Sequence, residues 1–252
     1  MRASTGRDSP RLFLLSLLFA LALWAGAAAV VGREVILPGP VAVFRLFGRL
    51  FYRGETWVHL GMTLFRGVLG FLLSYLAGLF IGLPCGLSRR FDAFFRPFLV
   101  GLRSTPTMAL ILLALIWFRA DAVAVFVTFL AVFPLVVQNV TDGVRSIDPA
   151  LLEMARVYRL RRGKLYRRVY LPAILPYLLA AAASGLGLTW KVIVAAEVLA
   201  APRWGVGTRM DRARVFLATP EVLAWTILVV AVGLFFDRVL ETTVRRRFFP
   251  WE

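Results

Sequence analysis

Cysteine, histidine, lysine and acidic residues are all scarce in this 252-residue chain, and each scarcity excludes a class of function. The single cysteine, Cys85, excludes an intramolecular disulfide and a cysteine-rich metal site. The single histidine, His59, has no histidine or cysteine beside it in the sequence, which argues against a zinc or di-iron centre. The only lysines, Lys164 and Lys191, follow no G-x-x-x-x-G-K-S/T loop. We therefore expect no nucleotide site, metal or other cofactor in this chain.

Negative charge is also scarce, with 14 acidic residues against 30 basic ones, and charged residues make up only 17% of the chain. Apolar residues make up 60%, and the mean hydropathy is +0.78. A soluble domain of this size cannot keep so much apolar surface from water, so the predicted solvent is the lipid bilayer. A formal charge of +16 would suggest nucleic acid as the partner of a soluble protein. In a membrane protein such charge collects in cytoplasmic loops beside anionic lipid, so we expect no nucleic-acid partner.

Six apolar regions are long enough to cross a bilayer as helices, which predicts an all-α membrane protein. They cover about 12–31, 59–87, 98–118, 122–144, 173–201 and 222–240, and Pro106 interrupts the third. The first is longer than the apolar core of a usual signal peptide, so we interpret it as a retained anchor rather than a cleaved signal. Residues 41–52 predict an amphipathic helix at the membrane interface. Residues 88–97 and 202–221 are predicted to be loops.

The charges of the loops orient these spans. If the N-terminus lies inside, the inner segments carry twice as many basic residues as the outer ones, which predicts that both termini are cytoplasmic. The predicted organisation is a cytoplasmic tail with the first span (1–34), an external amphipathic segment (35–58), a core (59–245) and a cytoplasmic tail (246–252).

The longest strongly polar segment, 146–176, lies between two spans and is rich in basic residues. Asp148 is placed to cap a helix whose first residue is Pro149, a position that suits proline because its missing N–H would have no partner there. We expect Leu171 and Pro172 to stop the segment before the next apolar run. One face of the helix is predicted to carry Leu151, Leu152, Ala155 and Tyr158. This pattern indicates either an ordinary cytoplasmic loop or a docking surface for a soluble partner.

Three charged residues lie well inside predicted spans, namely Arg66, Lys191 and Glu197. A charge in lipid costs several kcal/mol unless it is paired or hydrated, so we expect these side chains to face the protein interior. Arg66 and Glu197 lie at matching depths near the outer ends of their spans. We predict that they form an ion pair; the alternative is that each side chain reaches the membrane surface independently.

Uncharged polar residues inside spans are candidates for a substrate pathway. They are Thr105, Thr107, Gln138 and Asn139. These four either line a pathway or hydrogen-bond neighbouring helices together. Trp190 and Lys191 are two further pathway candidates. Lys191 lies deeper than Arg66 and meets either a substrate or a structural partner.

Several motifs together resemble the membrane-spanning permease subunit of bacterial ABC importers, in the branch that serves nitrate, taurine and alkanesulfonates. Glu153-Met154-Ala155-Arg156, followed by Leu171-Pro172, is similar to the EAA loop of that family. Leu37-Pro38-Gly39-Pro40 resembles its entry motif, and Thr63–Gly70 and Thr105–Leu110 resemble its second and third spans. The resemblance covers about residues 35–245 and implies a type I, MetI-like architecture with six spans.

The resemblance also implies partners. In this family two short coupling helices, here at about 146–170, insert into an ATP-binding subunit that holds ATP and Mg. The implied coupling residues are Asp148, Glu153, Ala155, Arg156, Arg159, Gly163, Leu171 and Pro172. The remaining implied partners are a periplasmic or lipid-anchored solute-binding protein and a second permease copy, in the bacterial cytoplasmic membrane. The implied solute is small and hydrophilic, such as a sulfonate, taurine, nitrate or a vitamin or pyrimidine precursor.

The chain departs from the family at the turn of the coupling region. Arg159 stands where a glycine is usual, and a glycine appears only at Gly163, so the region is either two short helices or one longer helix. Two other classes of function remain to be compared. An ion-coupled carrier would need intramembrane acids or inverted repeats, for which Glu197 alone is thin support. A membrane-embedded lipid enzyme would use Asp142, Arg145 and Asp148, which are too few and too scattered to bind metal and diphosphate.

Overall fold

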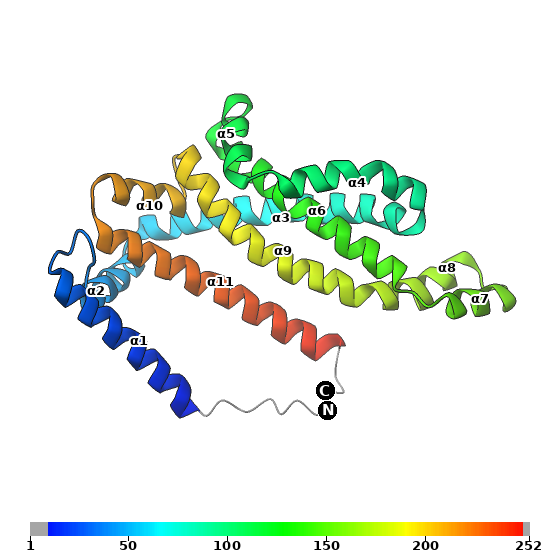
Figure 1. Cartoon of the computed structure of the whole chain (residues 1–252), viewed down its shortest axis with the longest axis horizontal. Coiled ribbons are helices and arrows are strands. Elements are labelled where there is room, and N and C mark those ends of the chain that lie inside the picture. The colour runs from blue at the N-terminus through cyan, green and yellow to red at the C-terminus, as the bar shows by residue number, and fades with distance from the viewer. Residues whose placement is uncertain (1–9, 249–252) are drawn as a thin grey trace. The chain divides into compact units, whose positions relative to one another are not determined.

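The computed structural model describes residues 10–248, except for the side chains of Pro10, Arg11, Phe13, Arg156, Arg162, Asp237 and 239–248. Every regular element within this range is helical (Figure 1). Five segments are long and apolar enough to cross a membrane: Leu14–Val31, Gly54–Leu87, Ala120–Arg145, Gly163–Ala200 and Thr219–Phe236. One bent helix pair makes a sixth if it is counted as one span. The predicted all-helical, multi-span fold is confirmed.

The described residues form two compact units, and the first combines the chain up to Trp57 with Arg209–Leu228. It contains α1 (Pro10–Val31) and α2 (Pro40–Phe51), the helix expected at 41–52. Pro40 opens α2, where its missing N–H breaks no hydrogen bond. The Trp24 indole N–H donates to the Pro38 carbonyl at 3.0 Å, so the proline-rich connection between the two helices is fixed against α1.

The second unit, Val58–Thr208 with the described residues from Val229, is built around α6 (Ala120–Arg145). α6 packs against α3 (Gly54–Leu87) and α9 (Leu171–Ala200). One core cluster joins all three helices through Phe71, Val132, Val136, Val140 and Ala181. A second cluster joins α6 and α9 to α5 (Thr107–Trp117) through Ile111, Ala114, Val123, Ala124, Val127, Val192, Ile193 and Ala196. These small and β-branched side chains keep the helix axes close together.

Small residues recur every fourth position along α3 and allow α6 to approach its backbone. The stripe consists of Gly70, Ser74, Gly78, Gly82 and Gly86. A Cβ atom at Gly78 would lie 2.6 Å from a methyl group of Val136, and one at Gly86 would lie 2.4 Å from Val144 Cβ. Interfaces between membrane helices favour such residues because lipid gives no hydrophobic drive to association, so close packing has to supply it.

The predicted third span and the loop before it are the largest differences from expectation. Helix α4 runs from Arg89 to Ser104, so it includes the predicted loop 88–97, and α5 follows it at a bend of 98°. The Ser88 hydroxyl caps α4 by accepting from the Phe91 N–H at 3.4 Å. The region breaks at Pro106 because proline cannot continue the hydrogen bonding of α4, and Pro106 becomes the N-cap of α5. The arginines of this segment alternate with phenylalanines at helical spacing, a pattern that the loop prediction overlooked.

Two further boundaries differ from the prediction. The expected loop 202–221 contains a helix, α10 (Val206–Val215). The last helix, α11, runs from Thr219 to Phe248 and so continues past the predicted end near Leu240. Charged residues at its end do not stop it, because a helix leaving lipid can continue in water. Residues 249–252 of the predicted tail, and residues 1–9 of the N-terminal tail, lie outside the described part of the chain.

Candidate functional site

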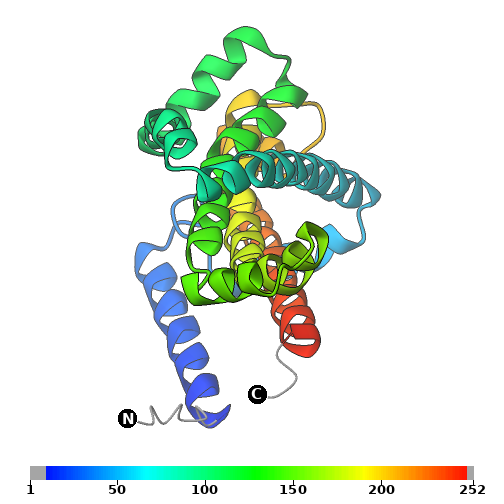
Figure 2. The same ribbon diagram turned by 90° about the vertical axis from the view of Figure 1, so that its right-hand side faces the viewer.

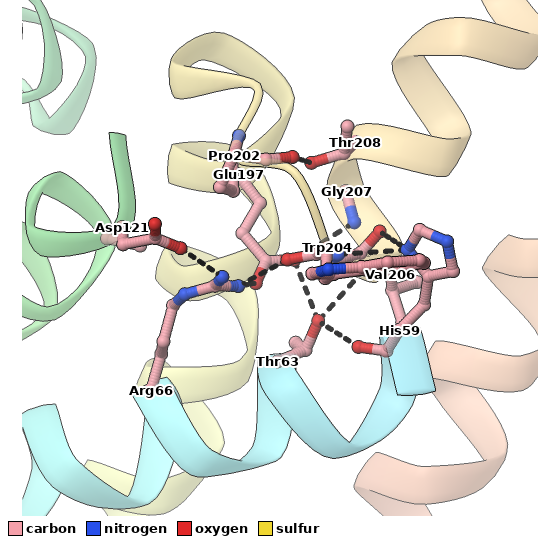
Figure 3. Close-up of polar contacts among 12 residues, drawn as sticks. His59, Thr63, Arg66, Asp121, Glu197, Pro202, Trp204, Val206, Gly207 and Thr208 are labelled. Carbon is pink, nitrogen blue, oxygen red and sulfur yellow. Dashed lines mark hydrogen bonds and ion pairs between the residues drawn. The ribbon is translucent and has the colours of Figure 1, made fainter. Parts of the chain in front are cut away.

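A buried ion-pair cluster joins α3, α6 and α9 (Figure 3). Arg66 on α3 places Nη1 2.7 Å from Oε1 of Glu197 on α9, and its Nη2 donates to Asp121 at the start of α6. The Arg66 side chain is 3% exposed and that of Glu197 is 0% exposed, whereas the Asp121 side chain is 67% exposed. The structure therefore brings together Arg66 and Glu197, which are predicted to pair because they lie at matching depths. It adds Asp121 as a third member.

Glu197 also holds the segment between α9 and α10. Its Oε2 accepts from the Gly207 N–H at 3.1 Å and lies 2.8 Å from the hydroxyl of Thr63. The Thr63 hydroxyl oxygen in turn accepts from the Val206 N–H at 2.9 Å. A Cβ atom at Gly207 would lie 2.5 Å from the carbonyl oxygen of Val194, so only glycine lets the segment approach α9 this closely.

Two more residues on the same face of α3 bind the backbone of this segment. Arg66 Nη1 donates to the Trp204 carbonyl at 2.7 Å, and Nδ1 of His59 lies 3.0 Å from the backbone nitrogen of Gly205. The rings of His59 and Trp204 pack edge to face, with centroids 5.1 Å apart. Residues 204–207 are thereby fixed by polar groups from α3 and α9 (Figure 3).

The sequence contained a signal for part of this cluster. His59, Thr63 and Arg66 are spaced four and three residues apart, so they lie on one face of an otherwise apolar helix. That spacing predicts that the three side chains share one polar neighbour. In the structure this neighbour is the cluster around Glu197. Asp121 gave no such signal, because a carboxylate just after the start of a helix is ordinary.

An open pocket of about 830 Å³ lies against the exposed side of the cluster. Its polar end consists of Arg66, Asp121 and Arg203. The Arg203 guanidinium lies 5.4 Å from the centre of the Trp204 ring, which also borders the pocket. The rest of the wall is apolar and comes from α3 and α6, including Leu69, Leu73, Val125, Phe126 and Phe129.

The predicted coupling region forms a compact element at one end of α6 and α9 (Figure 1), and Figure 2 looks onto it from that end. Helix α7 spans Pro149–Val157, so it begins at the predicted proline. Asp148 Oδ1 accepts from the Ala150 N–H at 2.9 Å, the predicted cap. Only three residues separate α6 from α7, and Ile147 among them is buried with Val144 and Ile174.

Arg159 makes the turn that the family makes with glycine. Its φ is +46°, in the left-handed region, and the Leu160 N–H donates to the Ala155 carbonyl at 3.0 Å. This six-to-one hydrogen bond around a left-handed residue is a Schellman end to α7. The region is therefore two short helices, α7 and α8 (Arg162–Leu165), with the turn at Arg159 and not at Gly163, which is part of α8.

Leu171 and Pro172 do not stop the segment as predicted. A π-helical turn, η1 (Tyr166–Tyr170), connects α8 directly to α9, and the Leu171 N–H donates to the Tyr166 carbonyl. The Pro172 ring would clash with a carbonyl four residues earlier in a regular α-helix. The wider π turn accommodates the proline and keeps the chain helical.

The four residues predicted to share one face of α7 are divided between its buried and its exposed side. Ala155 is buried and Leu152 packs beside Val144, Ile147 and Ile174. Leu151 and Tyr158 point away from this core and are 43% and 75% exposed. Met154 and Val157 are also exposed, at 48% and 79%, and Glu153 lies on the exposed surface with them. The Arg156 side chain lies outside the described part of the chain. The exposed apolar face of α7 thus comprises Leu151, Met154, Val157 and Tyr158.

The residues predicted for a substrate pathway are spread over separate places. The Thr105 hydroxyl donates to the Gly101 carbonyl at 2.8 Å, where α4 ends, and Thr107 opens α5. Gln138 donates to Asp142, and Asn139 donates to the Leu135 carbonyl, both one turn away along α6. Trp190 packs on Phe236, with ring centroids 5.5 Å apart, and Lys191 is exposed. The structure does not bring these six residues together into one site.

Comparison with known proteins gives a consistent result. Residues 74–248 match the family described as binding-protein-dependent transport system inner membrane component. The aliphatic sulfonates transport permease protein SsuC of Bacillus subtilis is 34% identical over 92% of this chain and 84% of its own length. The taurine transport system permease protein TauC of Escherichia coli is 30% identical over 90% of this chain and 84% of its own. The bicarbonate transport system permease protein CmpB of Synechococcus elongatus is 32% identical over 80% and 77%.

Solved structures share the fold. A chain of an amino acid ABC transporter with histidines superposes with a TM-score of 0.64, covering 81% of this chain and 96% of that one, at 20% identity. A chain of the MetNI methionine ABC transporter in an inward-facing conformation gives a TM-score of 0.54, covering 77% and 95%, also at 20% identity. At this identity the likeness shows the MetI-like fold alone.

Proposed function

Because the chain belongs to the family of binding-protein-dependent transport system inner membrane components, we propose a specific role for it in ATP-driven import. The chain is a multi-pass permease subunit of an ABC importer, and ATP hydrolysis belongs to a separate subunit. In the proposed role it forms the membrane pathway for a small polar solute of the sulfonate, taurine or bicarbonate type, in the bacterial cytoplasmic membrane with both termini inside. The names of the relatives support this solute class.

The exposed apolar face of α7 carries the proposal. Four large apolar side chains stand in the open on one short helix, and apolar surface presented in this way marks a protein contact. Glu153 lies among them, so the contact carries one negative charge. We propose that the ATP-binding subunit, which holds ATP and Mg, receives this face in a groove.

The packing behind α7 explains how the contact could drive transport. Ile147, Leu152 and Ala155 fix α7 to the ends of α6 and α9. Only three residues connect α6 to α7, and the Schellman turn follows α7 directly, so no long loop lies on either side. A displacement of α7 by the ATP-binding subunit would therefore move α6 and α9 with it. A flexible loop at this place would absorb the same motion.

The remaining partners follow from the proposed role. A solute-binding protein, periplasmic or lipid-anchored, would deliver solute to the side that holds residues 202–221. A second copy of the permease would complete the pathway. No observation favours an ion-coupled carrier or a lipid enzyme, because Glu197 is held by Arg66 and Arg145 pairs with Asp92 at 2.9 Å.

The test is capture of the ATP-binding subunit by the full-length permease in detergent. The wild-type chain is expected to hydrolyse no ATP alone and to retain the subunit on an affinity column. Glu153→Lys is expected to abolish retention, because it reverses the one negative charge that the exposed surface of α7 brings to the contact. Glu34→Lys, at an exposed glutamate between α1 and α2, is the matched control and should retain the subunit. Retention by Glu153→Lys equal to that of the control would refute the docking assignment.

A further inference from the structure

The three members of the ion-pair cluster are not equally fixed. Arg66 and Glu197 are buried, and Glu197 is held by Thr63 and the Gly207 N–H besides Arg66. Asp121 has one described partner, Arg66, and its side chain is 67% exposed to the pocket that it helps to line. A carboxylate that is already mostly exposed gains little from one ion pair, so the pair holds it only weakly.

We propose that Asp121 is a displaceable counterion and that the pocket beside it is an anion site. An incoming acidic group takes the place of the Asp121 carboxylate on Nη2 of Arg66, while Glu197 and the Trp204 carbonyl keep Nη1 in place. Arginine suits this exchange because its planar guanidinium donates hydrogen bonds to carboxylates and to other oxyanions in the same geometry. The inference rests on the proposed function, and it assigns to the importer a solute contact within the membrane subunit.

The walls of the pocket define the rest of the ligand. Apart from its charged end, the pocket is lined by apolar side chains from α3 and α6, including Leu69, Leu73 and Phe129. Its volume of about 830 Å³ lies in the range of small-molecule sites. A strongly acidic head with a short alkyl chain matches both parts, since the head meets Arg66 and Arg203 while the chain meets the walls. The site therefore favours n-alkanesulfonates over bicarbonate, which has nothing to place on the walls.

Asp121 also occupies the pocket-facing side of Arg66 when no solute is bound. With solute absent, the Asp121 carboxylate accepts from Nη2, while Glu197 remains the buried counter-charge at Nη1. With solute present, the released Asp121 carboxylate repels the anion that displaced it. This repulsion limits affinity, which a transport pathway needs because a solute that binds tightly does not leave.

The experiment measures hexanesulfonate binding by calorimetry to the full permease with its ATP-binding subunit, in phosphatidylcholine nanodiscs without the solute-binding protein. Asp121→Asn is expected to bind about fivefold tighter, the upper end for an exposed ion pair. Asp92→Asn is the matched control, since it removes a carboxylate paired with Arg145 at the opposite end of α3, and it should bind as wild type does. From methanesulfonate to hexanesulfonate, affinity should rise by up to about fourfold for each methylene buried.

Equal affinities of Asp121→Asn, Asp92→Asn and wild type would overturn the exchange. Affinity independent of chain length would overturn the assignment of the apolar walls. If phosphatidylglycerol nanodiscs abolish sulfonate binding, the occupant is an anionic lipid and the solute assignment is wrong. If Val125→Cys cross-links to a second copy and hexanesulfonate does not protect it, that copy fills the pocket and the proposal is wrong. ATP-dependent sulfonate uptake with the binding protein tests the proposed function separately, so intact uptake alongside equal affinities refutes the exchange alone.

Discussion

Replacing Glu197 with glutamine should destabilise the protein far more than replacing Asp121 with asparagine, although both contact the same arginine. Glu197→Gln leaves Arg66 buried without its inner counter-charge, and breaking a buried pair costs about 3–5 kcal/mol. The new amide also points a donor at the Gly207 N–H or at Thr63, where Oε2 now accepts. Asp121→Asn removes a charge whose side chain is mostly exposed and should cost less than about 1 kcal/mol.

The assay is thermal unfolding in detergent, followed by tryptophan fluorescence at one fixed heating rate. At about 2–4 °C per kcal/mol for a chain of this size, Glu197→Gln should lower the midpoint by about 6–20 °C and Asp121→Asn by less than about 4 °C. Equal shifts would refute the reasoning, since they would mean that exposure does not decide the energy. The double exchange Arg66→Glu with Glu197→Arg should recover little, because an arginine at position 197 cannot accept from Gly207.

Two further predictions concern backbone geometry. Gly78→Ala should lower the midpoint by about 2–12 °C, since its Cβ would lie 2.6 Å from Val136 and overpacking costs about 1–3 kcal/mol. Gly187→Ala, where nothing lies within 4 Å, should not lower it, and equal losses would contradict close packing on α3. Arg159→Gly should raise the midpoint by about 2–4 °C, because glycine removes roughly 1 kcal/mol of left-handed strain. Arg161→Gly lacks that relief and should not raise it; a matching rise would show that the turn is unstrained.

The membrane spans were predictable because burial in lipid acts on composition directly. Residues 122–144 and 173–201 differ by only a few residues from α6 and α9, since a long apolar run has one stable solution in a bilayer. The segment around Arg89 and Arg96 failed because its charge suggested water, whereas helical spacing of its phenylalanines decided the structure. In this segment the local charge indicated a loop and the periodicity indicated a helix. The periodicity predicted the structure correctly.

The ion-pair cluster was predictable only in part, for a geometric reason. Matching depth brings Arg66 and Glu197 to one level, but depth says nothing about rotation around the helix axis or about a third helix. Asp121 joins the cluster because α6 begins beside α3, a fact of tertiary packing. The turn at Arg159 was undecidable for a different reason: only glycine announces a left-handed residue, and here an arginine adopts that conformation.

Arg66 is synthesised before both of its acidic partners, and this order matters while the chain is inserted into the membrane. Asp121 follows Arg66 by 55 residues and Glu197 follows it by 131, so the buried arginine is made long before its buried partner. At about 5–20 residues per second, the wait for Glu197 lasts roughly 7–26 s. During this interval a lone arginine in the bilayer costs about 2.5–3.5 kcal/mol, and of the two acidic partners of Arg66 in the cluster Asp121 is made first. Asp121, the most exposed member of the cluster in the finished protein, is thus the one that can pair with Arg66 while the chain is being inserted into the membrane.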